Sequence, residues 1–413
     1  MRFLHLADLH LGKMLHGVSL LENGDQPAWV RAFLAEAEAL CPDAVCIAGD
    51  VYDRSAPSGD AVELLSELLT GLSRLQIPVM LIAGNHDSGQ RLSFLEKLLA
   101  REGVHIAGVL PPDGKLRHVT LRDAWGPVDF WLMPYVFPAL AAQVLGDESI
   151  RDYDTAVRRL LAAQEIDFSR RNVLIAHQNV THGGLEAERG GSETMVGGLG
   201  QVDESAFEGF SYVALGHIHA AGAVGKRTLR FAGSPLCYHF NEIKQPAKGP
   251  VLVELGAPGS EPEIRTILIP PLHPLRELRG GWEELRAAEA ARNGRGEYLR
   301  VVLTDSRVTP EIGDFFRSLA QTRDSRVLEL ASEYMPFGGE SAAAPGKQRE
   351  KSEEELFAEF YAERCGGEEP SEEDLELLHF AGERLRHRDG SGSSEQQDID
   401  ALLAFLDRQE AEA

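Results

Sequence analysis

The sequence lacks several features that mark whole classes of protein. No segment of its 413 residues has the ~20 consecutive apolar residues that a membrane-spanning helix needs. The N-terminus, MRFLHLADLH, lacks the basic head, long apolar run and cleavage site of a signal peptide. The sequence contains no CxxC pair, and its four cysteines are scattered: Cys41, Cys46, Cys237 and Cys365. We therefore expect a cytoplasmic protein without a membrane segment, whose thiols are reduced and mostly buried.

Basic charge is also scarce. The chain has 41 Lys and Arg against 65 Asp and Glu, a net charge of −24. DNA-binding proteins normally present a basic face, so this balance argues against strong DNA binding by this chain alone. Residues 341–413, with 8 basic and 20 acidic residues, carry half of the excess. That segment is a distinct acidic unit, and its simplest interpretation is a solvated, solubilising tail.

What the sequence does have is a repeated format of buried strand and polar end. Five short apolar runs each end in a small residue followed by Asp, Asn or His; they lie at 3–10, 44–50, 79–87, 173–178 and 212–219. Such runs predict strands buried on both faces. Helical periodicity occurs at 27–40 and 61–75, the latter with Ser58 and Asp60 as candidate N-caps. The alternation predicts a layered α/β fold with its site at the carboxyl ends of the strands.

Composition divides the chain into three expected domains. Residues 1–270 form the first, closed by further strands between 221 and 270. A Pro-rich stretch at 269–275 precedes a small α+β domain spanning 271–338. Residues 339–413 combine a linker with two amphipathic helical segments, and no internal repeat is visible.

Two of the polar ends carry acidic residues suited to metal binding. Asp8 and His10 form a DxH pair, and side chains at i and i+2 of an extended segment point the same way. Asp50 follows the second strand, where its two oxygens offer a bridge between two cations, and Gly49 permits a tight turn. Each motif alone is equally compatible with an ordinary capped turn.

The other ends supply amide and imidazole groups. Asn85 and His86 lie in GNHD, where Asn offers a neutral oxygen and Asp87 is suited to orienting the loop. His177, and His217 with His219 in GHIH, complete the set, although His177 by itself is equally well explained as a core histidine. Chance alone would rarely place ligand-type residues at all five strand ends. Imidazole with carboxylate suits Mn, Fe or Zn better than Mg or Ca.

This ligand set predicts two-metal phosphoryl chemistry. Two cations roughly 3.5–4 Å apart clamp a phosphate and lower the pKa of a water between them. His86 is then suited to stabilising the transition state or protonating the leaving group. Asp53, three residues after Asp50, either orients His86 or only caps the next segment.

The motifs resemble a known family when taken in order. They are similar to the calcineurin-like metallophosphoesterase superfamily, a layered β-sandwich flanked by helices. HLADLHLGK, IAGDVYDRSAPS, LIAGNHDS, ALGHIHAAG and FAGSPL further resemble the SbcD family of nuclease subunits, the bacterial branch of the double-strand-break repair exonucleases. The likeness is strong over residues 1–240, fair for the small domain and weak for the tail.

The resemblance implies specific roles and partners. One metal would be held by Asp8, His10, Asp50 and His219, and the second by Asp50, Asn85, His177 and His217, with His86 catalytic. It also implies Mn²⁺, a homodimer, and a heterotetramer with an SbcC-type coiled-coil ABC ATPase that degrades DNA ends and cleaves hairpins in DNA repair and recombination. Relatives outside bacteria tend to carry His at the position of Asp53, which puts a proton-transfer role there in doubt.

Three alternatives remain open at this level. A phosphomonoesterase or small-molecule phosphodiesterase shares the core, and GDxxDR at 49–54 also occurs in protein phosphatases. A non-enzymatic scaffold would be expected to have lost ligands, and none is lost. The two amphipathic tail segments are suited to docking on the ATPase, or to packing on each other or on their own domain. Their apolar residues are Leu356, Phe357, Phe360, Tyr361, Leu375, Leu377, Leu378 and Phe380.

Overall fold

The computed structural model describes residues 1–183, 200–245, 248–334 and 370–371. The chain divides into two compact units, Met1–Tyr334 and Met335–Ala413, and the account below concerns the first. The two amphipathic tail segments lie outside the described residues. The boundaries expected at 270 and 338 therefore remain predictions.

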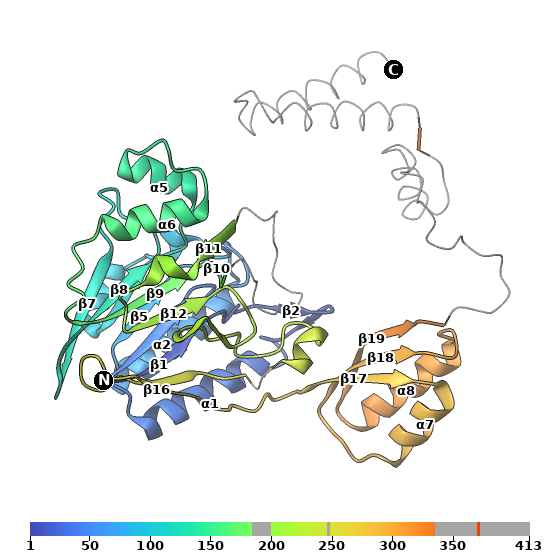
Figure 1. Ribbon diagram of the computed structural model, residues 1–413. Coiled ribbons are helices and arrows are strands. Elements are labelled where there is room, and N and C mark those ends of the chain that lie inside the picture. Colours follow the sequence, from blue (N-terminus) through green and yellow to red (C-terminus); the bar gives the residue numbers. More distant parts are fainter. Residues whose placement is uncertain (184–199, 246–247, 335–369, 372–413) are drawn as a thin grey trace. The chain divides into compact units, whose positions relative to one another are not determined.

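Two six-stranded sheets face each other in the first unit (Figure 1). The first has the order β16-β15-β1-β4-β5-β6 and the second β13-β14-β12-β9-β8-β7. The first sheet contains β1 (Arg2–Leu6), β4 (Ala44–Ala48), β5 (Val79–Ile82), β6 (Val104–Ala107), β15 (Val251–Glu254) and β16 (Glu263–Thr266). The second contains β7 (Arg117–Asp123), β8 (Gly126–Met133), β9 (Arg171–His177), β12 (Tyr212–Gly216), β13 (Gly222–Val224) and β14 (Lys226–Phe231).

The five predicted strands are confirmed as β1, β4, β5, β9 and β12. β1, β4, β5 and β6 run parallel in one sheet, and β8, β9, β12 and β14 run parallel in the other. Every residue of β4, β5, β9 and β12 is buried, as the unbroken apolar runs predict. Their carboxyl ends therefore lie at one edge of each sheet, where the polar residues follow.

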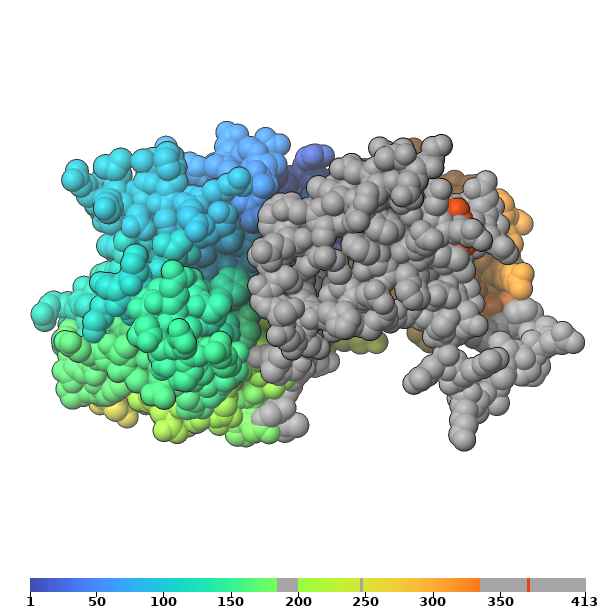
Figure 2. Space-filling model, turned by 90° about the horizontal axis from the view of Figure 1, so that it is seen from above, coloured from blue at the N-terminus to red at the C-terminus, as the bar shows by residue number. Residues whose placement is uncertain are grey.

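Apolar packing fills the space between the sheets and under the helices. Phe3, Phe130 and Tyr212 meet edge to face between the sheets, with ring centroids 5.5 Å apart for each of the two pairs with Phe3. Helices α1 (Asp25–Leu40) and α2 (Gly59–Arg74) cover the first sheet, and α5 (Pro138–Leu145) and α6 (Tyr153–Ala162) the second. Seen from above, the blue and cyan N-terminal half adjoins the green half that follows it (Figure 2).

Both predicted helices are confirmed, each starting two residues earlier than expected. Ser58 caps α2, and its hydroxyl accepts from the Ala61 backbone N–H, as the sequence predicts. Shorter elements complete the domain: β2 (Met14–Leu15), β3 (Val18–Ser19), α3 (Gly89–Leu92), α4 (Glu96–Leu99), β10 (Asn179–Thr181) and β11 (Gln201–Asp203). Single 3-10 turns occur at Ala100–Glu102, Glu204–Phe207 and Phe240–Lys244.

The small domain is a three-stranded parallel sheet with two crossover helices. In chain order it comprises β17 (Leu275–Gly280), α7 (Trp282–Ala291), β18 (Tyr298–Leu303), α8 (Pro310–Thr322) and β19 (Arg326–Ser332). β17 was not expected as a strand, and it begins at the last residue of the Pro-rich stretch at 269–275. Trp282, Phe315 and Phe316 form its aromatic core.

The cysteines are free thiols where the structure describes them, as expected. Cys46 is buried, Cys237 is half-buried and Cys41 is exposed. The expectation of mostly buried thiols is wrong for Cys41, because it follows the last turn of α1 at the surface. None of the helices in the described ranges is both long and apolar enough to cross a membrane.

Candidate metal centre and active site

The chain turns sharply where the candidate ligands lie. Asp8, His10, Asp50 and His217 have φ values of 54°, 41°, 47° and 100°. Residues with a Cβ rarely adopt this region, and each such position costs about 1–3 kcal/mol unless the surroundings enforce it. Four ligand-type residues at one edge therefore have a strained backbone conformation. The surrounding fold must hold them in it, which is typical of a functional site.

Glycine allows the ends of the two sheets to approach. A Cβ on Gly84 would lie 2.1 Å from Asp50 Oδ1, and one on Gly216 would lie 1.9 Å from the Ala48 carbonyl oxygen. Both distances are shorter than any real contact, so a side chain at either position would push the ligand loops apart. The small residues that end the strands are therefore part of the site.

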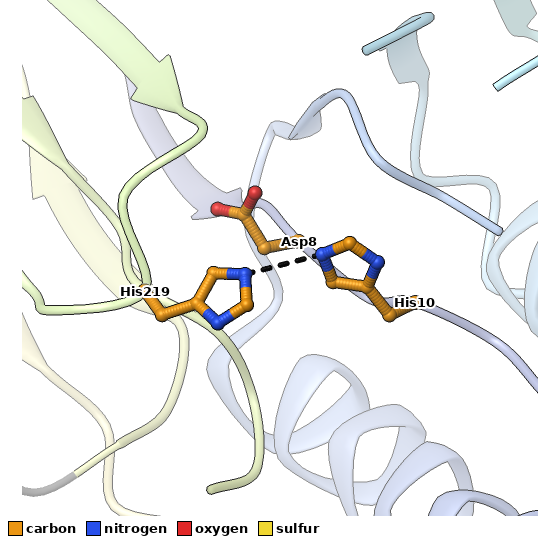
Figure 3. Close-up of side chains that lie close together, drawn as sticks. All are labelled: Asp8, His10 and His219. Carbon is orange, nitrogen blue, oxygen red and sulfur yellow. Dashed lines mark hydrogen bonds between the residues drawn. The ribbon is translucent and has the colours of Figure 1, made fainter. Parts of the chain in front are cut away.

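Asp8, His10 and His219 form one cluster (Figure 3). Each offers a ligand atom within 4.8 Å of the others, and all three residues are buried. The Nε2 atoms of His10 and His219 face each other at 3.1 Å. Residues 209 positions apart in the chain thus share one buried point.

Asp50 joins this cluster to a second one. Its Oδ2 lies 3.6 Å from His10 Nε2 and 3.4 Å from His177 Nε2. Asn85 Oδ1 lies 3.1 Å from both His177 Nε2 and His217 Nδ1. All seven predicted ligand residues therefore converge, with Asp50 between the two groups.

The donor atoms themselves fit a cation. His177 Nδ1 lies 2.8 Å from the Ala48 carbonyl oxygen, so this nitrogen carries the proton that it donates. Burial opposes protonation of His177, but Asp50 raises the pKa of His177 to about 9, so Nε2 also carries a proton, directed at the oxygens of Asn85 and Asp50. Once that proton leaves, Nε2 presents a lone pair to these oxygens. Lone pairs facing one another repel, and a metal ion between them turns this repulsion into coordination.

Burial sets the protonation of the carboxylates. Burial raises the pKa of Asp8 to about 6, in spite of the neighbouring imidazoles. Burial also opposes ionisation of Asp50, but His177, followed by His10 and His86, holds the pKa of Asp50 well below its usual range. A bound divalent cation would favour the ionised form of both groups.

His86 is half-buried, as Asn85 and His217 are, whereas the other five candidate ligands are buried. Its side chain is 28% exposed, against 2% for His10 and 0% for His177. Its backbone N–H donates to Asp50 Oδ1 at 2.9 Å, and its Nδ1 donates to the Asp53 carbonyl oxygen at 3.0 Å. Its Nε2 lies 4.0 Å from Asp50 Oδ2, at the rim of the cluster.

Asp53 contacts His86 through its backbone and not through its carboxylate. The carboxylate accepts from Lys13 Nζ at 2.7 Å and lies 3.6 Å from His10 Nδ1.

Asp87 has the loop-orienting position expected of it. Its carboxylate accepts from the backbone N–H groups of Val51, Tyr52 and Gly84 at 2.9–3.1 Å.

The structure adds residues that the sequence motifs did not reveal. Glu242, fully buried, lies 3.2 Å from His219 Nδ1 and 2.9 Å from Lys248 Nζ. The ring of Tyr135 lies over the other side, with its centroid 6.1 Å from that of His177 and 6.4 Å from that of His217. Neither residue follows one of the five strand ends, so the signal that identified the ligands does not reach them.

Comparisons with known proteins find relatives of this chain. Residues 1–221 match the calcineurin-like phosphoesterase family, and residues 271–364 match a family described as the type 5 capsule protein repressor C-terminal domain. The SbcD component of the nuclease SbcCD from Staphylococcus saprophyticus is 35% identical over 289 residues, which cover 69% of this chain and 73% of the relative. The protein of the same name from Staphylococcus epidermidis is 30% identical over 312 residues, or 74% of this chain and 79% of the relative.

The chain belongs to the SbcD family of nuclease subunits. Its first domain is a calcineurin-like phosphoesterase, a family that binds divalent metal ions, and the converging Asp, Asn and His residues form a possible metal site. A solved structure from Thermus thermophilus matches 45% of this chain and 71% of its own, with 15% identity and a TM-score of 0.28. That likeness is too low to carry any argument about this SbcD-family chain.

Proposed function

We propose that this SbcD-family chain hydrolyses phosphodiester bonds at DNA ends and hairpins, as a manganese-dependent exonuclease and endonuclease. The observation that supports this proposal most is the convergence of seven ligand-type side chains from both sheets, with Asp50 between two clusters. The class of reaction is inferred from the family relationship. The requirement for metal is inferred from the buried donor atoms.

Two ions account for the ligand set. Asp8, His10, Asp50 and His219 would hold one, and Asp50, Asn85, His177 and His217 the other. When bound, such a pair clamps a phosphate and lowers the pKa of the attacking water. Nitrogen ligands beside carboxylates suit Mn²⁺ better than Mg²⁺. Five of the seven ligand residues are buried, and Asn85 and His217 are half-buried.

His86 is the group best placed to act on the substrate. Its Nδ1 donates to the Asp53 carbonyl oxygen, so its Nε2 is the atom that remains for the substrate, and Nε2 donates to a phosphoryl or leaving-group oxygen when both ring nitrogens are protonated. We assign Asp53 a positioning role: its carbonyl orients the His86 ring, and its carboxylate retains Lys13 beside His10.

Partners follow from the family and from the charge. We propose an SbcC-type ATPase as partner, and a homodimer of this chain within a heterotetramer. With a net charge of −24, this chain gains little from phosphate attraction, and an ATPase subunit that binds DNA would supply it. The free thiols of Cys41, Cys46 and Cys237 support a location in the cytoplasm.

A DNA assay tests the proposal directly. The full chain, alone and with its ATPase partner, is given linear, circular and hairpin DNA with Mn²⁺, with and without ATP. We expect cleavage of ends and hairpins that ceases when metal is chelated. Hydrolysis of small phosphate esters at full rate without action on any DNA would instead assign the chain to a different phosphoesterase activity.

A single substitution separates catalysis from metal binding. His86→Ser is expected to reduce cleavage sharply while elemental analysis still finds two metal ions per chain, because His86 lies at the rim of the cluster. Equal loss of metal and activity would show that His86 is a ligand.

A further inference from the structure

An aromatic pair borders the metal centre on the side of His177 and His217. Tyr135 and Phe137 lie between the end of β8 and the start of α5. The Tyr135 backbone N–H donates to the Ala83 carbonyl oxygen at 2.9 Å, which ties this segment to the loop that carries Asn85. The aromatic pair is thus fixed to the same frame as the candidate ligands.

Tyr135 is a rigid support for its neighbour. Its ring contacts those of Phe137 and Tyr153, with centroids 4.7 Å and 6.0 Å away, and its hydroxyl is hydrogen-bonded to Tyr153. Its ring also faces His177 and His217. Four rings therefore restrain Tyr135, and its position relative to the metal centre is determined by packing.

The aromatic ring of Phe137 is exposed to solvent beside Tyr135. It is 48% exposed, although it directly precedes α5, whose Ala141 is completely buried. Single exposed apolar residues are common and need no special explanation. Phe137 differs from such residues because Tyr135 supports it and links it to two candidate metal ligands.

The acidic net charge of the chain also favours contacts with the substrate that do not depend on charge. With a net charge of −24, this chain offers little attraction to phosphates other than the one that the two metals would clamp. Stacking of bases on aromatic rings works without charge and tolerates any sequence, because every base has a π face. A base within a duplex is not available for such stacking, whereas a base at a frayed end or in a hairpin loop is.

We propose that Phe137, supported by Tyr135, forms a stacking subsite for the unpaired base of a nucleotide next to the bond that is cut. The proposal rests on the nuclease function proposed above. It defines the substrate at this position as an unpaired nucleotide that keeps its base. The subsite selects structure, namely ends and loops, and not sequence.

The test uses single-stranded oligonucleotides with one cleavable phosphodiester among methylphosphonate linkages. One substrate carries bases on both sides of that bond. In the other two, the nucleotide on one side or on the other side of the bond is abasic. Full-length wild type, Phe137→Ala, Phe137→Trp and Phe168→Ala are compared by kcat/KM in Mn²⁺. Phe168 is a matched control, because it is 49% exposed, contacts Phe210 edge to face and is not part of the site.

We expect Phe137→Ala to lower kcat/KM by about 5- to 150-fold on the base-bearing substrate. The kcat/KM of wild type should fall by a similar factor when the base on one particular side of the bond is absent. The kcat/KM of Phe137→Ala should not fall further when that base is removed. Phe137→Trp should retain the preference, and Phe168→Ala should behave as wild type. A purely structural role of Phe137 would lower cleavage of base-bearing and abasic substrates alike.

Two results would overturn the subsite, and they differ. If wild type cleaves base-bearing and abasic substrates equally, the nuclease function stands and the stacking subsite is wrong. If wild type cleaves neither these oligonucleotides nor the linear and hairpin DNA of the assay proposed above, with or without its partner, the nuclease function fails and the subsite fails with it.

Discussion

Replacing Glu242 with Gln should lower the affinity of the chain for one metal ion and leave its affinity for the other unchanged. The Glu242 carboxylate lies 3.2 Å from His219 Nδ1, 2.9 Å from Lys248 Nζ and 3.1 Å from the Tyr238 backbone nitrogen. Burial opposes its charge, but His219 and Lys248 hold the pKa of Glu242 well below its usual range. The carboxylate therefore retains the proton of His219 on Nδ1, so that Nε2 is the atom that would bind metal.

The substitution keeps the shape of Glu242 and removes its charge. A metal-bound imidazole that loses its carboxylate partner typically loses about 10- to 100-fold in metal affinity, or roughly 1.4–2.8 kcal/mol. We expect a loss of this size for the ion held by Asp8, His10, Asp50 and His219. The ion held by Asn85, His177 and His217 should change little, because Glu242 acts through His219, which belongs to the first group.

Calorimetric titration of the metal-free full chain with Mn²⁺ measures both affinities. Glu289→Gln is a matched control: Glu289 is 3% exposed and pairs with Arg276 at 2.7 Å and Arg323 at 3.2 Å in the small domain. This control also breaks a buried ion pair but should leave both metal affinities unchanged. If Glu242→Gln binds both ions as tightly as wild type, the orienting role of Glu242 is refuted.

Two further changes test other parts of the account. Burial, with help from Arg230, lowers the pKa of His5 to about 3, so between pH 6.5 and 3 the unfolded chain binds one proton more than the folded chain, and stability falls as pH falls. Metal-free wild type should therefore lose about 2 kcal/mol more than His5→Gln between pH 7.5 and 5 in urea unfolding; equal losses would contradict the assignment of His5 as a buried neutral group. Deleting residues 349–413 should spare hydrolysis of a chromogenic phosphodiester but abolish co-purification with the ATPase, and surviving co-purification would rule out tail docking.

The fold was largely predictable because buried parallel strands leave a strong local signal. Continuous apolar runs ending in Gly or Ala before Asp, Asn or His located β1, β4, β5, β9 and β12. β7 was not predicted, since its residues alternate between exposed and half-buried and it is paired only with β8. β17 was also missed, because LRELRG has only one buried residue and follows a Pro-rich stretch.

The candidate site was predictable only as far as its motifs extend. All seven candidate ligands lie at or just after strand ends, and shared strand direction brings them to one edge. Glu242 lies in a 3-10 turn, and nothing in FNEIK indicates that its side chain turns inward to His219. Whether Asp53 acts through its side chain or its carbonyl depends on a backbone conformation that the sequence does not reveal. Tyr135 reaches the site only through the close approach of β8 and β5.

Anomalous diffraction from crystals of the full chain grown with Mn²⁺ tests the central claim most directly. We predict two manganese peaks about 3.5–4 Å apart, both bonded to Asp50. One should also contact Asp8, His10 and His219, and the other Asn85, His177 and His217. A single peak, or peaks away from these side chains, would contradict the account.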